Sequence, residues 1–188
     1  LEETSSLMKD KSTIFEAAFL ADEVRIRADI LTPDECGYRL IEVKSSTEVK
    51  EYQLEDIAIQ AWVIKESGHE LTQLAVSVIN NQFVYGGDKN YEGLFSDVIV
   101  DNDVAHIVPQ VKVWISEAKK ILQQTWEPVE QVGEKCRKPF ECNFIGYCNP
   151  NLPGVEYPIE ILPYGKKKID ELKELGFNNL LDVPAELL

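Results

Sequence analysis

The sequence contains no long apolar segment and no recognisable targeting signal. No stretch approaches the roughly 20 consecutive apolar residues that a membrane-spanning helix needs. No basic start followed by an apolar run indicates secretion. We therefore expect a cytoplasmic protein with no membrane partner. The chain begins at Leu1 rather than at a methionine, so we expect it to be part of a longer protein.

Basic residues are scarce. Lysine and arginine together number 19 against 33 aspartates and glutamates, which gives a formal net charge of −14. Proteins that coat nucleic acids are normally basic, so this charge counts against tight non-specific binding of DNA or RNA. An enzyme that cleaves nucleic acid is less constrained, because a bound divalent metal supplies positive charge and a few lysines suffice to hold phosphates.

Histidine is rare, and cysteine occurs at only four positions. His69 and His106 fall in a predicted turn and near a predicted helix start, where we expect structural roles. In a reducing compartment, clustered cysteines bind metal more often than they form disulfides. The spacing Cys136-x5-Cys142-x5-Cys148 is typical of ligands for zinc or an iron–sulfur cluster, with free reduced thiols as the alternative.

What is present suffices for one ordinary domain and a small appendage. The chain has 188 residues and a hydrophobic fraction of 44%, enough to build a packed core. Apolar periodicity predicts, in order, strands at 12–20, 23–31 and 38–46, a helix at 51–66, strands at 71–79, 82–86 and 95–100, and a helix at 109–124. We therefore expect an α/β domain.

Side-chain periodicity also predicts which residues are buried. Strict alternation in 23–31 places Ala28 and Ile30 on one face and Asp29 and Leu31 on the other. Residues 1–11 are polar and predict no element, and Cys36 is expected in the turn after the second strand. The expected buried residues of the two helices are Leu54, Ile57, Ala58, Ala61 and Ile64 in the first, and Val113, Ala118, Ile121 and Leu122 in the second.

Two acidic residues and a lysine fall on the second and third predicted strands. Asp29 lies near the end of one strand, and Glu42 and Lys44 share a face of the next. Antiparallel neighbours bring opposed side chains within about 5 Å. We expect these three groups to converge, with a solvated cross-strand ion pair as the alternative.

This set of groups is suited to phosphodiester hydrolysis. Carboxylates such as those of Asp29 and Glu42 hold Mg²⁺ or Mn²⁺, and the carbonyl of Val43 lies between two of the candidate positions. The metal lowers the pKa of a bound water, and the ammonium of Lys44 can stabilise developing negative charge.

The pattern Asp29, then Glu42-Val43-Lys44, then Gln60 on the following helix resembles the PD-(D/E)XK nuclease superfamily, in particular its RecB-like exonuclease branch. The resemblance implies a restriction-endonuclease-like mixed sheet flanked by helices. It also implies Asp29 and Glu42 as metal ligands, Lys44 as the catalytic lysine and Gln60 as a residue that lines the site.

Further residues near this pattern are weaker candidates. Gln53 and Asp56 lie on a helix face similar to that of Gln60 and are second-rank site residues. Glu16 is the nearest acidic alternative to the metal ligand that the family's upstream helix often supplies. The branch has a tyrosine four residues after the glutamine, where this chain has Ile64. The helix that precedes the family's first strand is not predicted before residue 12.

The C-terminal part of the chain extends the resemblance. Some RecB-like nucleases carry a [4Fe–4S] cluster held by one upstream cysteine and three downstream ones, which implies this role for Cys136, Cys142 and Cys148 and places the fourth ligand before Leu1. Zinc is the alternative. The final segment resembles a helix-hairpin-helix unit, a small helical hairpin whose lysines Lys166, Lys167 and Lys168 would grip phosphate.

The whole order resembles a bacterial family in which such a nuclease domain is followed by a predicted RNase H-like nuclease, so that domain is an expected partner, fused or associated. We expect a nuclease domain at 1–153 and the hairpin at 154–188. The expected function is metal-dependent hydrolysis of DNA, as an exonuclease in repair, recombination or defence. The alternatives are a scaffold that binds nucleic acid without cleaving it and a structural metalloprotein.

Overall fold

The computed structural model describes residues 1–130, 132–148, 157–162 and 166–187. The chain forms two compact units, Leu1–Gln123 and Gln124–Leu188. The predicted boundary between residues 153 and 154 lies outside the described residues. No helix in the described part of the chain is long and apolar enough to cross a membrane.

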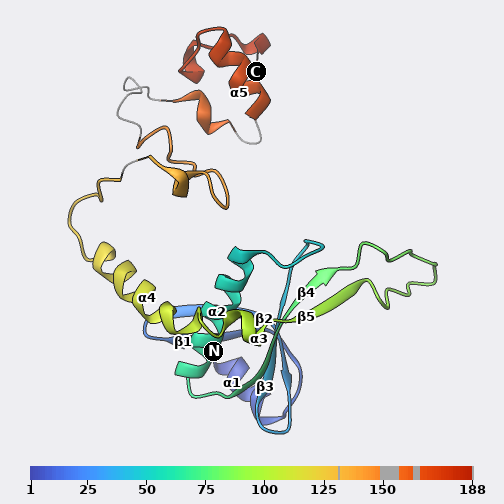
Figure 1. Ribbon diagram of the computed structural model, residues 1–188. Helices are drawn as coiled ribbons and strands as arrows, with labels where there is room; N and C mark the ends of the chain where they lie inside the picture. The colour runs from blue at the N-terminus through green and yellow to red at the C-terminus, as the bar shows by residue number, and fades with distance from the viewer. Residues whose placement is uncertain (131, 149–156, 163–165, 188) are drawn as a thin grey trace. The chain divides into compact units, whose positions relative to one another are not determined.

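The first unit is an α/β domain with a mixed five-stranded sheet flanked by helices, as predicted (Figure 1). Its elements are α1 (Glu2–Lys9), β1 (Ile14–Ala21), β2 (Val24–Pro33), β3 (Tyr38–Val43), α2 (Glu51–Glu66), β4 (Leu71–Ile79), β5 (Phe95–Ile99), α3 (Asp101–Val104) and α4 (Val108–Leu122). The predicted helix at 51–66 coincides with α2. The first three predicted strands correspond to β1, β2 and β3.

The strands follow one another in space in chain order, β1-β2-β3-β4-β5. All neighbours are antiparallel except β3 and β4, which are parallel. Parallel neighbours need a crossover connection, because the chain must return to the end of the sheet at which the first strand began. Here α2 is the crossover, so it packs on the sheet directly beside the end of β3.

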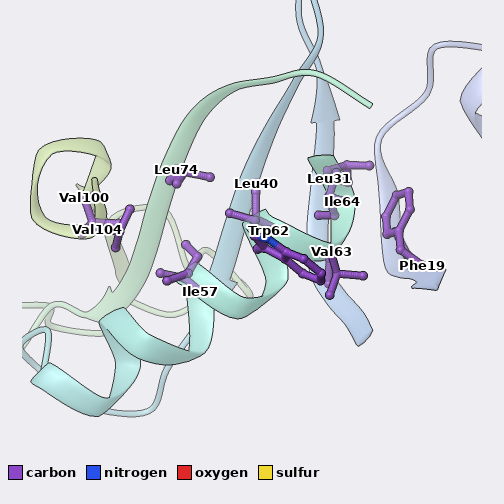
Figure 2. Packing of buried hydrophobic residues seen from close by; sticks show 14 of the residues in the cluster. Phe19, Leu31, Leu40, Ile57, Trp62, Val63, Ile64, Leu74, Val100 and Val104 are labelled. Carbon is purple, nitrogen blue, oxygen red and sulfur yellow. The ribbon is translucent and has the colours of Figure 1, made fainter. Parts of the chain in front are cut away.

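The core lies between α2 and the sheet (Figure 2). Ile57 and Ile64 of α2 are fully buried, as are Leu31 of β2 and Leu40 of β3. Four of the five residues predicted for this helix stripe are fully buried, and Leu54 is partly buried. Each large apolar side chain buried in this way contributes about 1.5–3 kcal/mol, so α2 is held firmly against the strands.

Strict alternation is wrong at one point of β2. Ala28 and Leu31 both lie in the core, so the alternation breaks between Ala28 and Asp29. Opposite this point on β1, Glu16 has a positive φ of 57°, and the pairing of Glu16 with Asp29 is missing from the ladder. Asp29 and Leu31 therefore lie on the same side of β2 as each other.

Two further predictions of local structure are wrong. The first residues form α1, because Thr4 and Met8 are buried and the Thr4 hydroxyl accepts a 3.0 Å hydrogen bond from the Ala18 N–H on β1. Residues 82–86 form no strand. The Asn80 side chain donates to the Gly93 carbonyl at 2.9 Å, and β4 pairs instead with β5 beyond a long loop.

The predicted buried face of α4 is also wrong. Val113, Ile121 and Leu122 are exposed to 56%, 50% and 83%. Val111 and Ile115 are buried instead, one turn apart on the stripe that packs against α2. The helix has enough apolar residues on both sides that periodicity alone chose the wrong stripe.

The second unit is smaller. A small apolar cluster contains Ile159, Leu172 and Val183. Its described elements are the 3-10 turns Glu134–Cys136, Ile159–Ile161, Leu180–Asp182 and Ala185–Leu187 and one α-helix, α5 (Lys166–Glu174). Because α5 is the one α-helix among the described residues of this unit, the predicted helical hairpin stays a prediction.

Candidate active site

Asp29 and the Glu42–Lys44 segment meet at one end of the sheet. Leu31 pairs with Leu40. Continuing that antiparallel register by two residues on each strand places Asp29 opposite Glu42. Glu42 and Leu40 share a side of β3 because side chains alternate. The predicted convergence of Asp29 with Glu42 therefore follows from the observed register.

Asp29 is tied to β3 by its side chain. Its Oδ2 accepts a 2.8 Å hydrogen bond from the Val43 N–H. The other oxygen, Oδ1, receives no hydrogen bond from the described residues. Within a strand the N–H and C=O of one residue point to the same side, so the Val43 carbonyl also faces the β2 side. Three oxygen-bearing groups, including Glu42, thus border one small volume.

Glu42 is the most buried charged residue of the site, with 6% of its surface exposed. Lys44 Nζ lies 2.7 Å from its Oε1, and Gln60 Nε2 donates to its Oε2 at 2.8 Å. Burial raises the pKa of the Glu42 carboxyl, and these two hydrogen bonds offset part of that rise. The negative charge of Asp29 raises the same pKa further, which agrees with the closeness of the two carboxyl groups.

Lys44 joins two carboxylates. Its Nζ donates to Glu42 at 2.7 Å and to Asp56 Oδ2 at 2.5 Å. Burial lowers the pKa of Lys44, but the hydrogen bonds to Asp56 and Glu42 outweigh burial and leave the pKa above its ordinary value. Lys44 is therefore a cation in the folded protein. An ammonium has three N–H donors, so one remains for another acceptor.

Helix α2 supplies the other half of the site. Asp56 and Gln60 lie one turn apart, and Gln60 Nε2 also approaches Asp56 Oδ1 at 3.4 Å. The oxygen of the Gln60 amide is buried and has no hydrogen-bond partner among the described residues. The sequence ranks Asp56 below the main site candidates, yet Asp56 accepts a hydrogen bond from Lys44, the candidate catalytic lysine. Its spacing of four residues from Gln60 was the available signal.

Gln53 lies one helical turn before Asp56 and has a structural role. Its Oε1 accepts the Lys50 N–H at 2.9 Å, and its Nε2 donates to Ser46 Oγ at 3.1 Å. It therefore fixes the short connection from β3 into α2. Ile64 is fully buried in the core, so the position that carries tyrosine in RecB-like nucleases has no access to the site here.

The donor set is compatible with Mg²⁺ or Mn²⁺. Magnesium keeps several waters and is usually held by one or two carboxylates together with substrate phosphates. Asp29 and Glu42 supply two carboxylates, and Val43 supplies a carbonyl oxygen. The buried oxygen of Gln60, which has no hydrogen-bond partner among the described residues, is a further acceptor beside them. The part of the chain that the structure describes holds no group of three or more histidine, cysteine, aspartate or glutamate side chains that could bind a metal.

That finding extends to the cysteines. Cys136, Cys142 and Cys148 are partly exposed free thiols in the second unit, and the described residues do not gather them into a metal-binding group. A zinc or [4Fe–4S] site there stays a prediction. Cys36 is exposed in the β2–β3 turn.

The remaining predicted residues are spread over both units. The rings of His69 and Phe19 pack in an edge-to-face arrangement, with centroids 5.5 Å apart. Glu16 forms a 3.4 Å ion pair with the exposed Arg27. Lys166, Lys167 and Lys168 begin α5, and Lys168 pairs with Glu171 at 3.5 Å.

No family model matches the sequence, and a comparison with curated proteins finds no match. Among solved structures, the crystal structure of SSO0001 matches with 15% sequence identity and a TM-score of 0.30. The match covers 68% of this chain and 59% of that one.

Proposed function

We propose that this chain is a Mg²⁺- or Mn²⁺-dependent nuclease of the PD-(D/E)XK type that hydrolyses DNA phosphodiester bonds. The observation that carries the proposal is the buried Glu42 carboxylate, which is held by Lys44 and Gln60 beside Asp29. A buried acid with a raised pKa, a charged lysine and a second acid in one place is a set that suits metal-assisted phosphodiester hydrolysis.

The chain's own residues have separate roles in this proposal. Asp29, Glu42 and the Val43 carbonyl would hold the cation. When bound, the metal supplies a water of lowered pKa and positive charge beside the phosphate. Gln60 keeps Glu42 oriented, and Asp56 keeps Lys44 charged and in place. Lys44 directs its remaining donor to a phosphate oxygen or to the attacking water.

A scaffold that binds nucleic acid without cleaving it is the second candidate. One observation favours it: the described residues hold no group of three or more histidine, cysteine, aspartate or glutamate side chains that could bind a metal. If the chain is a nuclease, cleavage should depend on Lys44. If it is a scaffold, the parent chain should not cleave at all. We further propose a cytoplasmic setting and an RNase H-like partner domain, in keeping with the resemblance.

A cleavage assay separates the two candidates. End-labelled single-stranded and duplex DNA are incubated with Mn²⁺ and the parent chain, Glu42→Ala or Lys44→Ala. We expect each substitution to lower the rate by a factor on the order of 100 or more, as loss of a charge-stabilising group does in other enzymes. The matched control is Lys65→Ala, because Lys65 is exposed on α2. Equal cleavage by all four proteins would refute the nuclease proposal.

A further inference from the structure

The long loop between β4 and β5 (residues 80–94) extends away from the sheet (Figure 1). It begins at the same end of the sheet as the candidate site. Ser77 of β4 pairs with Val43, and the Ser77 carbonyl accepts the Lys44 N–H at 2.9 Å. The Ile79 N–H donates to the Ser46 carbonyl at 2.9 Å, and the loop follows directly. A polymer bound across the candidate site therefore has this loop as a neighbour.

The loop is held in shape by its own hydrogen bonds. At its base, the Asn80 N–H donates to the Leu94 carbonyl at 2.8 Å, and the Asn80 side chain donates to Gly93. Near its tip, the Lys89 N–H donates to the Tyr85 hydroxyl at 3.0 Å. These contacts present the tip in a defined conformation.

Two aromatic rings lie exposed on this loop. Tyr85 and Tyr91 are stacked, with ring centroids 5.2 Å apart and an angle of 14° between the rings. Tyr85 is 51% exposed and Tyr91 is 56% exposed. Stacking covers one face of each ring and leaves flat aromatic surface open to solvent. Aromatic rings usually contribute to stability by being buried, so an exposed stacked pair needs another explanation.

The charge of the loop narrows the choice of ligand. It carries Asp88, Lys89 and Glu92, so it is close to neutral in a chain whose net charge is −14. A neutral aromatic surface attracts flat π systems without requiring positive charge. Unpaired nucleic acid bases stack on aromatic side chains in this way, and bases inside a duplex are not accessible for it.

We propose that the Tyr85–Tyr91 pair is a stacking platform for an unpaired base of a single-stranded nucleic acid that also occupies the candidate site. The inference rests on the proposed function for the identity of the polymer and goes beyond it by naming the strand form. It also explains how so acidic a chain holds its substrate, since stacking does not depend on neutralising phosphates.

The test measures binding apart from cleavage. Fluorescein-labelled dT20 and a duplex of equal length are titrated with the full chain in the absence of divalent metal, using anisotropy. Tyr91→Ala and Tyr91→Leu are expected to weaken dT20 binding by about tenfold to a hundredfold, the loss typical of one stacked base. Tyr91→Phe, which keeps the ring, should bind within about twofold of the parent. Thermal melting of each variant verifies that it is folded.

Salt dependence gives an independent reading of the same contact. Plots of log affinity against log salt for the parent and Tyr91→Ala should be parallel, because the lost contact releases no counterions. An arm with rU20 shows whether the platform accepts RNA as well as DNA. Equal dT20 binding by Tyr91→Ala and the parent, equal binding by Tyr91→Leu and Tyr91→Phe, or no dT20 binding by the parent each overturns the platform.

The outcomes are separable from those of the cleavage assay. Gln110→Leu should bind dT20 as the parent does, because Gln110 is exposed on α4 and belongs neither to the platform nor to the candidate site. If the parent binds dT20 through Tyr91 but cleaves nothing with Mn²⁺, the platform stands and the nuclease proposal fails. If the parent cleaves and Tyr91→Ala binds dT20 unchanged, the nuclease proposal stands and the platform fails.

Discussion

The side-chain amide of Gln60 on α2 donates a 2.8 Å hydrogen bond to Glu42 Oε2 on β3. Both residues are buried, with 5% and 6% of their surfaces exposed. This bond couples the crossover helix to the most buried acid of the candidate site. A shift of α2 along the sheet would therefore move the groups of the site relative to one another. A substitution at Gln60 should change the orientation and the pKa of the Glu42 carboxyl.

Gln60→Leu should lower cleavage by about tenfold to a hundredfold, as loss of an outer-shell partner does at other metal sites. Leucine has a similar size but cannot donate to Glu42, so the carboxylate loses an orienting hydrogen bond and its pKa rises further. The measurement is the Mn²⁺ concentration that gives half-maximal cleavage, which should increase.

The control for this prediction is Gln110→Leu on α4. The Gln110 side chain is exposed and donates at 3.0 Å to the carbonyl of His106, which lies in the turn just before α4. Cleavage by this variant should equal that of the parent. A Gln60→Leu enzyme with unchanged rate and unchanged metal dependence would show that Gln60 only fills space.

The raised pKa of Glu42 predicts two opposite pH trends. A protonated carboxyl does not bind a cation, so Mn²⁺ affinity should increase as pH rises through this pKa and then level off. Without metal, the folded state binds the proton more tightly than the unfolded state. The free energy of unfolding should therefore decrease as pH rises through the same range.

Both trends are measurable by calorimetric titration of Mn²⁺ and by urea unfolding in metal-free buffer. Glu42→Gln removes the titrating group, so both pH dependences should flatten in that variant. Metal-free stability that instead rises over this range in the parent, and not in Glu42→Gln, would contradict the assignment.

Gly37→Ala should destabilise the first unit by about 1–3 kcal/mol, the usual cost of forcing extra atoms into a packed place. A Cβ at this position would lie 2.5 Å from the Glu70 carbonyl oxygen, which is main chain and has little room to move. That carbonyl also accepts the Tyr38 N–H at 3.0 Å, so a shift would disturb the start of β3. Chemical denaturation is the measurement.

Gly86→Ala is the matched control, since a Cβ there meets nothing within 4 Å. Its free energy of unfolding should stay within about 0.5 kcal/mol of the parent, as is usual for open surface positions. Similar losses in both variants would mean that the close approach at Gly37 is not the cause.

Cys142→Ser should remove bound iron or zinc if the cysteines of the second unit form the predicted metal site. Thiolates are the ligands such sites use, and serine cannot replace one without loss of affinity. The measurement is metal content and visible absorbance of anaerobically purified protein. Cys36→Ser is the control, because Cys36 lies in the β2–β3 turn. A parent protein that is free of both metals would contradict the prediction.

Local sequence patterns predicted most elements of the first unit. Alternation and helical spacing are short-range properties, so β2, β3 and α2 were predictable, and so was the sharing of one face by Glu42 and Lys44. The predictions failed where distant contacts decide. The hydrogen bond from the Ala18 N–H to the Thr4 hydroxyl stabilises α1 against β1. Strand β4 pairs with Phe95–Ile99 and not with residues 82–86, which are nearer in the sequence.

By itself, the sequence determined the chemical groups of the candidate site and the strands and helix that carry them. Only the tertiary structure decided how they meet. The antiparallel register set Asp29 against Glu42, and the packing of α2 brought Asp56 to Lys44 and Gln60 to Glu42. The physical reason is that hydrogen bonding and burial act through space, whereas periodicity reports only on neighbours along the chain.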